Sequence, residues 1–285
     1  MELIRLNEDS LFEYEDVIAP DAVDCIGRQF HSGLAVTDGK KDPELLAYMV
    51  WEYIRRKDAS DNEAVIIKFF SKDEKAGRML AAAFDEELSK ERVKRCTFYF
   101  EKEDADAASV LSEAGFVTET REGPFTMVSL SDCASLSVAK SKTPDYVVPI
   151  EDLMIRQFRN GIDLCVRNGR RGIFSDLEYL PMSWFDEEIS GCVFQDDEVK
   201  GFLLVTYTAG GELVPALLFD FETDATKNLL HMIAFTIRAA AKKYPPDTRV
   251  LLVNNSEMSE ALIKKLFPMA KPYEILFGER VQNEG

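Results

Sequence analysis

The sequence is poor in the residue patterns that build metal and redox centres. It has two histidines and five cysteines among 285 residues. The cysteines form no CxxC pair and have no spacing linked to a histidine: they are Cys25, Cys96, Cys133, Cys165 and Cys192. Zinc sites and disulfide scaffolds depend on such spacings. We therefore expect the reduced thiols of a cytoplasmic protein and no metal site.

Long hydrophobic runs and clustered basic residues are also missing. No apolar run approaches a membrane span, and the N-terminal segment MELIRLNEDS lacks the basic and then hydrophobic pattern of a signal sequence. The 34 basic and 51 acidic residues give a formal net charge of −17. Nucleic acids and anionic membranes bind clustered Lys and Arg, so neither is an expected partner. The oligomeric state is left open.

Sequence motifs of the common hydrolases and nucleotidases are absent as well. The chain contains no G-x-S-x-G, Walker or HExxH motif, so none of these enzyme classes has a motif in its favour. His31 could border a substrate pocket, but a lone histidine is more often structural. His231, inside a helical pattern, is interpreted as a packing residue.

The most informative stretch covers residues 63–87. Residues 65–70 (VIIKFF) are rich in β-branched and aromatic side chains, which predicts a strand buried on both faces. A polar loop follows over residues 71–77, and from residue 78 the apolar side chains recur at helical spacing. A strand that ends at a helix start presents unpaired N–H groups and the positive end of the helix dipole, which favours an anion site.

The elements around this stretch recur later in the chain. The first half predicts strands at residues 2–6, 45–54 and 93–100, helices at residues 10–30 (broken at Pro20) and 104–114, and two strands around Gly123 within residues 116–130. The second half predicts strands at residues 146–149, 189–195, 199–208, 213–221 and 250–254, and helices at residues 150–167, 228–244 and 256–267. Arg95 and Arg249 are offset by 249 − 95 = 154 residues.

This repetition predicts two tandem domains of the α/β (α+β) class. The small and polar residues 133–145 are the best linker candidate. The predicted domains are therefore residues 1–132 and 146–285.

The layout resembles that of GNAT-family N-acetyltransferases. In that family the loop and helix after the fourth strand carry R/Q-x-x-G-x-G/A, and a later helix carries N-x-x-A-x-x-L-Y-x-x-x-G-F. Residues 72–78 (KDEKAGR) lie on the first motif, and residues 104–116, ending LSEAGF, lie on the second. The corresponding segments of the second half are residues 223–229 and 255–268. The resemblance implies two tandem GNAT-like domains, each a mixed, mostly antiparallel sheet flanked by helices, and acetyl-CoA as cosubstrate.

The resemblance implies an acetyl-CoA site in the N-terminal domain, formed by Lys72, Lys75, Ala76, Gly77 and Arg78. Glycines in this motif let backbone N–H groups approach the pyrophosphate, and basic side chains add charge. Gly77 keeps the second glycine, whereas Lys75 replaces the first. A solvated helix start of mixed charge is the alternative interpretation.

The corresponding loop of the C-terminal half has no glycine and two acidic residues, so we expect it not to bind CoA. Thr223 or Asp224 is better explained there as a helix N-cap.

The catalytic groups are less well defined by the sequence. An acetyltransferase must accept a proton from the amine and return one to the departing thiolate. The family's tyrosine position holds Leu111 and Ile263, neither of which can donate a proton. The candidates are Glu52, Tyr53, Glu63 and Glu101, each of which could instead have a surface or strand-end role. Tyr53 should share a strand face with Trp51, and Glu52 should point to the other face.

Two function classes follow from these patterns. The first is an acyl-CoA-dependent N-acetyltransferase that acetylates the amine of a small molecule, with CoA bound by the N-terminal domain. The acidic composition favours a cationic acceptor. The second is a tandem GNAT-fold protein without catalysis that serves as a binding or interaction module, which the missing tyrosines and the incomplete glycine loop favour.

Overall fold

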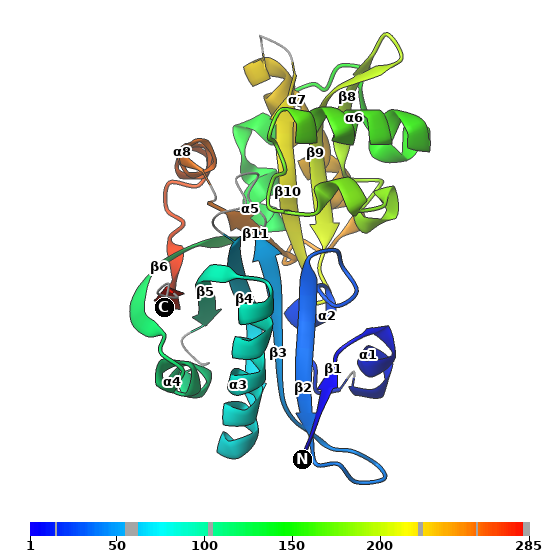
Figure 1. The fold of residues 1–285 in the computed structure, drawn as a ribbon. Coiled ribbons are helices and arrows are strands. Elements are labelled where there is room, and N and C mark those ends of the chain that lie inside the picture. Colours follow the sequence, from blue (N-terminus) through cyan, green and yellow to red (C-terminus); the bar gives the residue numbers. More distant parts are fainter. Residues whose placement is uncertain (15, 55–61, 102–104, 222–224, 255, 282–285) are drawn as a thin grey trace. The chain divides into compact units, whose positions relative to one another are not determined.

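The computed structural model describes residues 1–14, 16–54, 62–101, 105–221, 225–254 and 256–281 (Figure 1). The chain divides into two compact units. Unit 1 comprises Met1–Gly123 and Glu274–Gly285, and unit 2 comprises Pro124–Tyr273. Within the described residues, no helix combines the length and apolar character needed to cross a membrane.

Unit 1 is built on a mixed sheet with the strand order β1–β2–β3–β4–β5–β12–β6. The strands are β1 (Glu2–Arg5), β2 (His31–Thr37), β3 (Leu45–Ile54), β4 (Asn62–Ser71), β5 (Val93–Glu101), β12 (Pro272–Val281) and the first half of β6 (Val117–Ser129). β4 and β5 are parallel, whereas β1/β2, β2/β3, β3/β4 and β5/β12 pair antiparallel.

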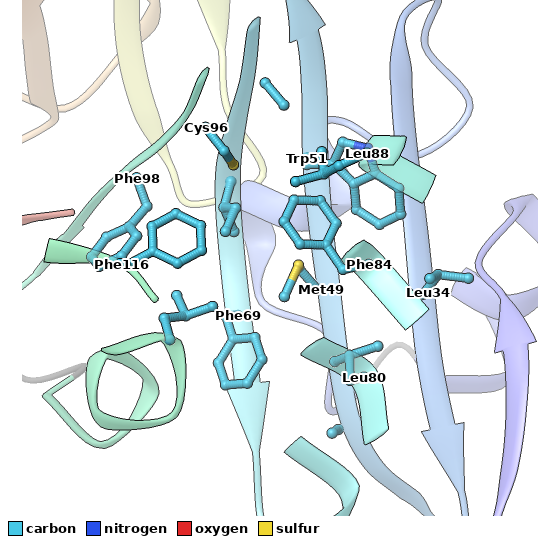
Figure 2. Close-up of a cluster of buried hydrophobic side chains, with 14 of the residues drawn as sticks. Leu34, Met49, Trp51, Phe69, Leu80, Phe84, Leu88, Cys96, Phe98 and Phe116 are labelled. Atoms are coloured by element: carbon cyan, nitrogen blue, oxygen red, sulfur yellow. The ribbon is translucent and has the colours of Figure 1, made fainter. Parts of the chain in front are cut away.

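Helices cover both faces of this sheet because alternate strand residues are apolar on each side. α3 (Glu74–Lys90) and α4 (Ala105–Glu113) pack on one face, where Met49 and Trp51 of β3 meet Phe84 of α3 (Figure 2). α1 (Glu8–Tyr14) and α2 (Pro20–Val23) pack on the other face, against Tyr48 and Val50. The predicted helix break at Pro20 is confirmed, since α2 begins there.

Unit 2 repeats this architecture with the strand order β6–β11–β10–β9–β8–β7. Its strands are the second half of β6, β11 (Arg249–Val253), β10 (Glu212–Asp220), β9 (Glu198–Tyr207), β8 (Gly191–Gln195) and β7 (Val147–Pro149). β10 and β11 are parallel, as β4 and β5 are in unit 1. α5 (Leu130–Ser135), α7 (Ala225–Lys243) and α8 (Glu257–Leu266) pack on one face, and α6 (Ile155–Arg167) packs on the other.

The last strand of the chain does not belong to the unit that precedes it. β12 pairs with β5 of unit 1 from Ile275↔Glu101 to Val281↔Arg95. The second half of β6 pairs with β11 of unit 2, from Phe125↔Val253 to Ser129↔Arg249. Each unit therefore contains a strand from the other half of the sequence.

This exchange explains why the compact units differ from the predicted domains 1–132 and 146–285. The predicted linker, residues 133–145, includes the end of α5 and a 3₁₀ turn at Ser137–Lys140. Cys133, Val138 and Ala139 are buried in the core of unit 2.

The two strands predicted around Gly123 form one strand, β6, and this prediction was wrong. A Cβ atom added at Gly123 would lie 2.7 Å from Cγ2 of Ile275. The glycine therefore permits the close approach of β12 and does not mark a turn.

All five cysteines are free and buried, and burial raises the pKa of each thiol to about 12. At pH 8 only about one thiol in 10⁴ is then ionised, and the thiolate is the reactive form. We expect a disulfide reagent such as DTNB to leave the folded protein unlabelled at pH 8 and to label all five thiols in concentrated urea. The exposed variant Ser135→Cys is the positive control, and rapid labelling of the unaltered folded protein would contradict this prediction.

Candidate functional site

The predicted acetyl-CoA site of unit 1 lies where β4 meets α3, and a carboxylate already caps this helix. The Asp73 side chain accepts a hydrogen bond from the backbone N–H of Ala76 at 2.8 Å. The backbone carbonyl of Asp73 accepts the N–H of Gly77 at 2.9 Å and the hydroxyl of Ser71 at 2.7 Å. These N–H groups are therefore bonded within the protein, and the carboxylate stands where a bound anion would accept them.

The basic residues of this segment are paired with acidic ones. Lys72 Nζ lies 3.3 Å from Glu44 Oε1. Arg78 contacts Glu74 at 2.5 Å and Glu113 at 3.1 Å. A pyrophosphate here would meet carboxylates as well as cations, and like charges repel.

Gly77 has a packing role in the structure. It is buried, and a Cβ atom at this position would lie 2.9 Å from Ser71 Oγ and 3.3 Å from Ser71 Cβ. The missing side chain lets the first turn of α3 approach the end of β4. Lys75 is exposed, and Ala76 is buried beside Gly77.

Aromatic rings fill the core of unit 1 beyond the paired part of β4 and β5. The parallel pairing runs from Asn62↔Val93 to Ile66↔Phe98. At the last pair and beyond it, Phe98 of β5 and Phe69 of β4 are buried together with Phe116 (Figure 2). Phe100 of β5 is buried in the same cluster. The rings of Phe98 and Phe100 stack with centroids 4.4 Å apart.

The predicted catalytic residues Glu52, Tyr53 and Glu63 lie on the neighbouring strands β3 and β4 but do not share one face of the sheet. Tyr53 packs beside Trp51 on the α3 face, with ring centroids 6.1 Å apart, and burial raises its pKa. Glu52 points to the other face, and its Oε1 atom lies 4.0 Å from Nε2 of His31. The predicted division of these side chains between two faces is confirmed.

Glu63 lies at the start of β4, 3.7 Å from Arg95. The predicted cofactor residues follow the other end of β4. With a rise of about 3.3 Å per residue, the eight steps from Glu63 to Ser71 span about 26 Å.

In unit 2 the corresponding parallel strands separate early. β10 and β11 pair at Glu212↔Arg249 and Leu213↔Val250, and the described register contains no further pair between them. β10 continues along β9 with a register shift at Ala216, and β11 continues along β6. β10 and β11 therefore do not pair with each other over the rest of their described length.

An apolar cavity of about 130 Å³ lies between the sheet face formed by β9, β10 and β11 and the helices α5, α7 and α8. None of its described lining residues is charged. Cys133 lines it with a protonated thiol, because burial raises the pKa of this thiol to about 12. Characteristic lining residues are Leu213 and Leu218 of β10, Leu252 of β11, Thr236 of α7, and Ile263 and Leu266 of α8.

A loop after α6 closes the opposite face of β10. The Ile173 N–H donates a hydrogen bond of 2.9 Å to the carbonyl of Ala216, the bulged residue of β10. Gly172 has φ +62°, and a Cβ atom there would lie 2.0 Å from the same carbonyl oxygen. Only glycine allows this approach.

Comparison with solved structures identifies the fold. A tandem GNAT protein from the clavulanic acid biosynthesis pathway, solved without AcCoA, matches 100% of this chain and 99% of its own, with a TM-score of 0.63 and 11% identity. The chain has a tandem GNAT fold.

Two further structures have the same fold. A GCN5-related N-acetyltransferase from Sphaerobacter thermophilus matches 98% of this chain and 86% of its own, with a TM-score of 0.53 and 13% identity. A probable N-acyltransferase from Enterococcus faecalis V583 matches 98% of this chain and 72% of its own, with a TM-score of 0.52 and 10% identity. Comparison of the sequence with protein-family models and with curated proteins gave no match.

The resemblance to the GNAT family and the predicted fold class are therefore confirmed at the level of the fold. The suggested caps Thr223 and Asp224 lie outside the described residues, and α7 begins at Ala225.

The cavity of the second GNAT-like unit was missed, although a comparison of the two halves contains its signal. Ile67 is the bulged residue of β4 and Ala216 is that of β10. Phe69 and Leu218 each lie two residues after the bulge, so they occupy corresponding positions. Counted from the pairs Glu63↔Arg95 and Glu212↔Arg249, Phe98 corresponds to Leu252. Unit 2 thus has a leucine at both positions where unit 1 has a phenyl ring, and the smaller side chains leave space between the strands.

Proposed function

We propose that this tandem GNAT-fold protein is an acyl-CoA-dependent N-acyltransferase whose acyl-CoA binds in unit 2, contrary to the sequence-based expectation that CoA binds the N-terminal domain and not the C-terminal half. The observation that carries the proposal is the early separation of β10 and β11 beside an apolar cavity. An acetyl-CoA site at Lys72, Lys75, Ala76, Gly77 and Arg78 of unit 1 stays a prediction. The capping carboxylate of Asp73 and the paired cations weigh against it.

The pantetheine arm of acyl-CoA is suited to the space between the separated strands β10 and β11. This arm is an extended chain with amide groups, which can pair with backbone N–H and C=O groups of an open strand edge as an added strand would. The acyl group at its end is apolar and fits a cavity without charged residues. The GNAT fold of the solved structures, two of them described as N-acetyl- or N-acyltransferases, supports this assignment.

The reaction would transfer the acyl group from the thioester sulfur to an amine. The neutral amine nitrogen attacks the thioester carbonyl, the C–S bond breaks, and the thiolate takes up a proton while the amine nitrogen loses one. The net charge of −17 favours a cationic small-molecule amine as acceptor.

A second candidate function is binding of the acyl-CoA without catalysis. Ile263 stands at the position of the family's tyrosine and lines the cavity, where it can donate no proton.

The assignment to unit 2 predicts which variants lose ligand binding. We expect acetyl-CoA to stabilise the protein against thermal unfolding, by about 2.7 kcal/mol at a ligand concentration 100 times the dissociation constant. Leu252→Trp places a large ring between β10 and β11 and should abolish this shift. Lys72→Glu, at the helix start of unit 1, should leave it unchanged, because Lys72 is already paired with Glu44.

Circular dichroism would establish that both variants are folded. Loss of the shift in Lys72→Glu but not in Leu252→Trp would move the ligand to unit 1. A folded protein with no shift for CoA or any acyl-CoA would contradict the proposal. Release of free CoA thiol in the presence of a panel of amines separates the enzyme from the binding protein, which would bind without release.

A further inference from the structure

We propose that the unit 2 cavity selects an acyl group longer than acetyl, with an unbranched or branched hydrocarbon chain of about five or six carbon atoms. This inference rests on the proposed function and names the class of acyl donor.

The volume exceeds what an acetyl group can fill. The cavity measures about 130 Å³. A dry cavity of roughly 150 Å³ lined by Leu, Ile and Phe accepts benzene, a molecule of six carbon atoms. Acetyl offers one methyl group beyond its carbonyl, so most of the cavity wall would lose its contacts. A longer hydrocarbon chain restores these contacts and keeps the cavity free of water.

The chemistry of the walls restricts the chain to hydrocarbon. The described lining residues are aliphatic or aromatic, apart from the small side chains of Cys133 and Thr236. A second carboxylate, as in a succinyl group, would be buried without a cationic partner, which is strongly unfavourable. We therefore expect dicarboxylic acyl donors to be excluded.

Leu218 lines the cavity from the sheet and Ile263 lines it from α8. Leu218 replaces the phenyl ring that unit 1 has at Phe69, and Ile263 closes the side formed by α8. Enlarging Leu218 shortens the space for the chain, whereas truncating Ile263 lengthens it. The two changes should therefore move the preferred chain length in opposite directions.

The test measures dissociation constants of acetyl-, butyryl-, hexanoyl-, decanoyl- and succinyl-CoA by calorimetry with the 285-residue protein. Each buried methylene should tighten binding about fourfold. Hexanoyl-CoA, with four more methylenes than acetyl-CoA, should then bind about 200-fold more tightly. Decanoyl-CoA, too long for the cavity, and succinyl-CoA should bind more weakly than hexanoyl-CoA.

The variants make the outcome decisive. Leu218→Phe should move the tightest binding towards butyryl-CoA, and Ile263→Ala should move it towards decanoyl-CoA. A substitution at a residue that only supports the fold would weaken the binding of acyl-CoAs of every chain length alike. Acetyl-CoA binding as tightly as hexanoyl-CoA, or a preferred length that neither variant moves, would overturn this inference while leaving the proposed function standing. Failure of every acyl-CoA to bind the folded protein would overturn the proposed function itself.

Discussion

A fragment of residues 1–132 should fail to fold, whereas residues 1–123 joined to residues 274–281 through a short glycine-rich linker should fold. β12 contributes Ile275 and Phe277 to unit 1, with exposures of 4% and 5%. Burial of two such side chains contributes about 3 to 6 kcal/mol, which is comparable to the whole stability of many domains. Without β12 the edge of β5 is also left open, and open edges promote aggregation.

Arg280 makes polar contacts that the fragment of residues 1–132 lacks. Its guanidinium donates to Asp85 Oδ1 at 2.5 Å and to the Ala114 carbonyl at 2.8 Å, and it lies 4.9 Å from the centre of the Phe116 ring. Loss of Arg280 would leave α4 and the end of α3 without the cation that joins them.

The joined fragment is feasible because its ends are close. Gly123 approaches Ile275 so tightly that a Cβ atom there would lie 2.7 Å from Ile275 Cγ2. Urea unfolding followed by circular dichroism would compare the two fragments. The matched control is the joined fragment with Ile275→Asp and Phe277→Asp, which should behave like residues 1–132. Cooperative unfolding of residues 1–132 at the midpoint of the joined fragment would refute the exchange of strands.

Gly172→Ala should lower the free energy of unfolding of unit 2 by about 2 to 5 kcal/mol. A left-handed conformation contributes about 1 to 2 kcal/mol of this strain in any residue with a Cβ atom, and overpacking adds about 1 to 3 kcal/mol. The new Cβ atom would lie 2.0 Å from the carbonyl oxygen of Ala216. Backbone cannot move aside as a flexible side chain can, so the loop must leave β10 and lose the hydrogen bond from Ile173.

Gly169→Ala is the matched control for this variant. Gly169 has φ +69°, close to the +62° of Gly172, but a Cβ atom there would have no neighbour within 4 Å. The free energy of unfolding of Gly169→Ala should therefore fall only by the cost of the left-handed conformation, about 1 to 2 kcal/mol. Chemical denaturation of both variants isolates the effect of the close approach. Equal losses would show that Gly172 is needed for its φ angle alone.

Sequence patterns predicted many of the local elements, although they missed β2 and divided β6 into two strands. The run LLAYMVWEYI predicts residues 45–54 as a strand, and β3 has these bounds. The alternation that sends Trp51 and Tyr53 to one face and Glu52 to the other follows from the period of a strand. The order of elements was repeated clearly enough to predict two GNAT-like units.

Long-range pairing was beyond the reach of the same patterns. The segment of β12, PYEILFGERV, has nothing in its composition that selects β5 as a neighbour. Likewise, Lys72 and Arg78 resemble phosphate ligands until Glu44 and Glu113, distant in sequence, are seen beside them. The cavity of unit 2 depends on side-chain volumes across several elements, so it required the packed structure.

The position of β12 reverses the usual order in which a growing chain matures on the ribosome. Unit 2 has all its residues once Tyr273 has been added, but unit 1 must wait for the strand that follows. At about 5 to 20 residues per second, the 281 − 123 = 158 residues after Gly123 take roughly 8 to 30 s to synthesise. Unit 1 is thus the first to begin synthesis and the last to complete its fold. During those seconds the nascent chain exposes an incomplete sheet that chaperones can recognise.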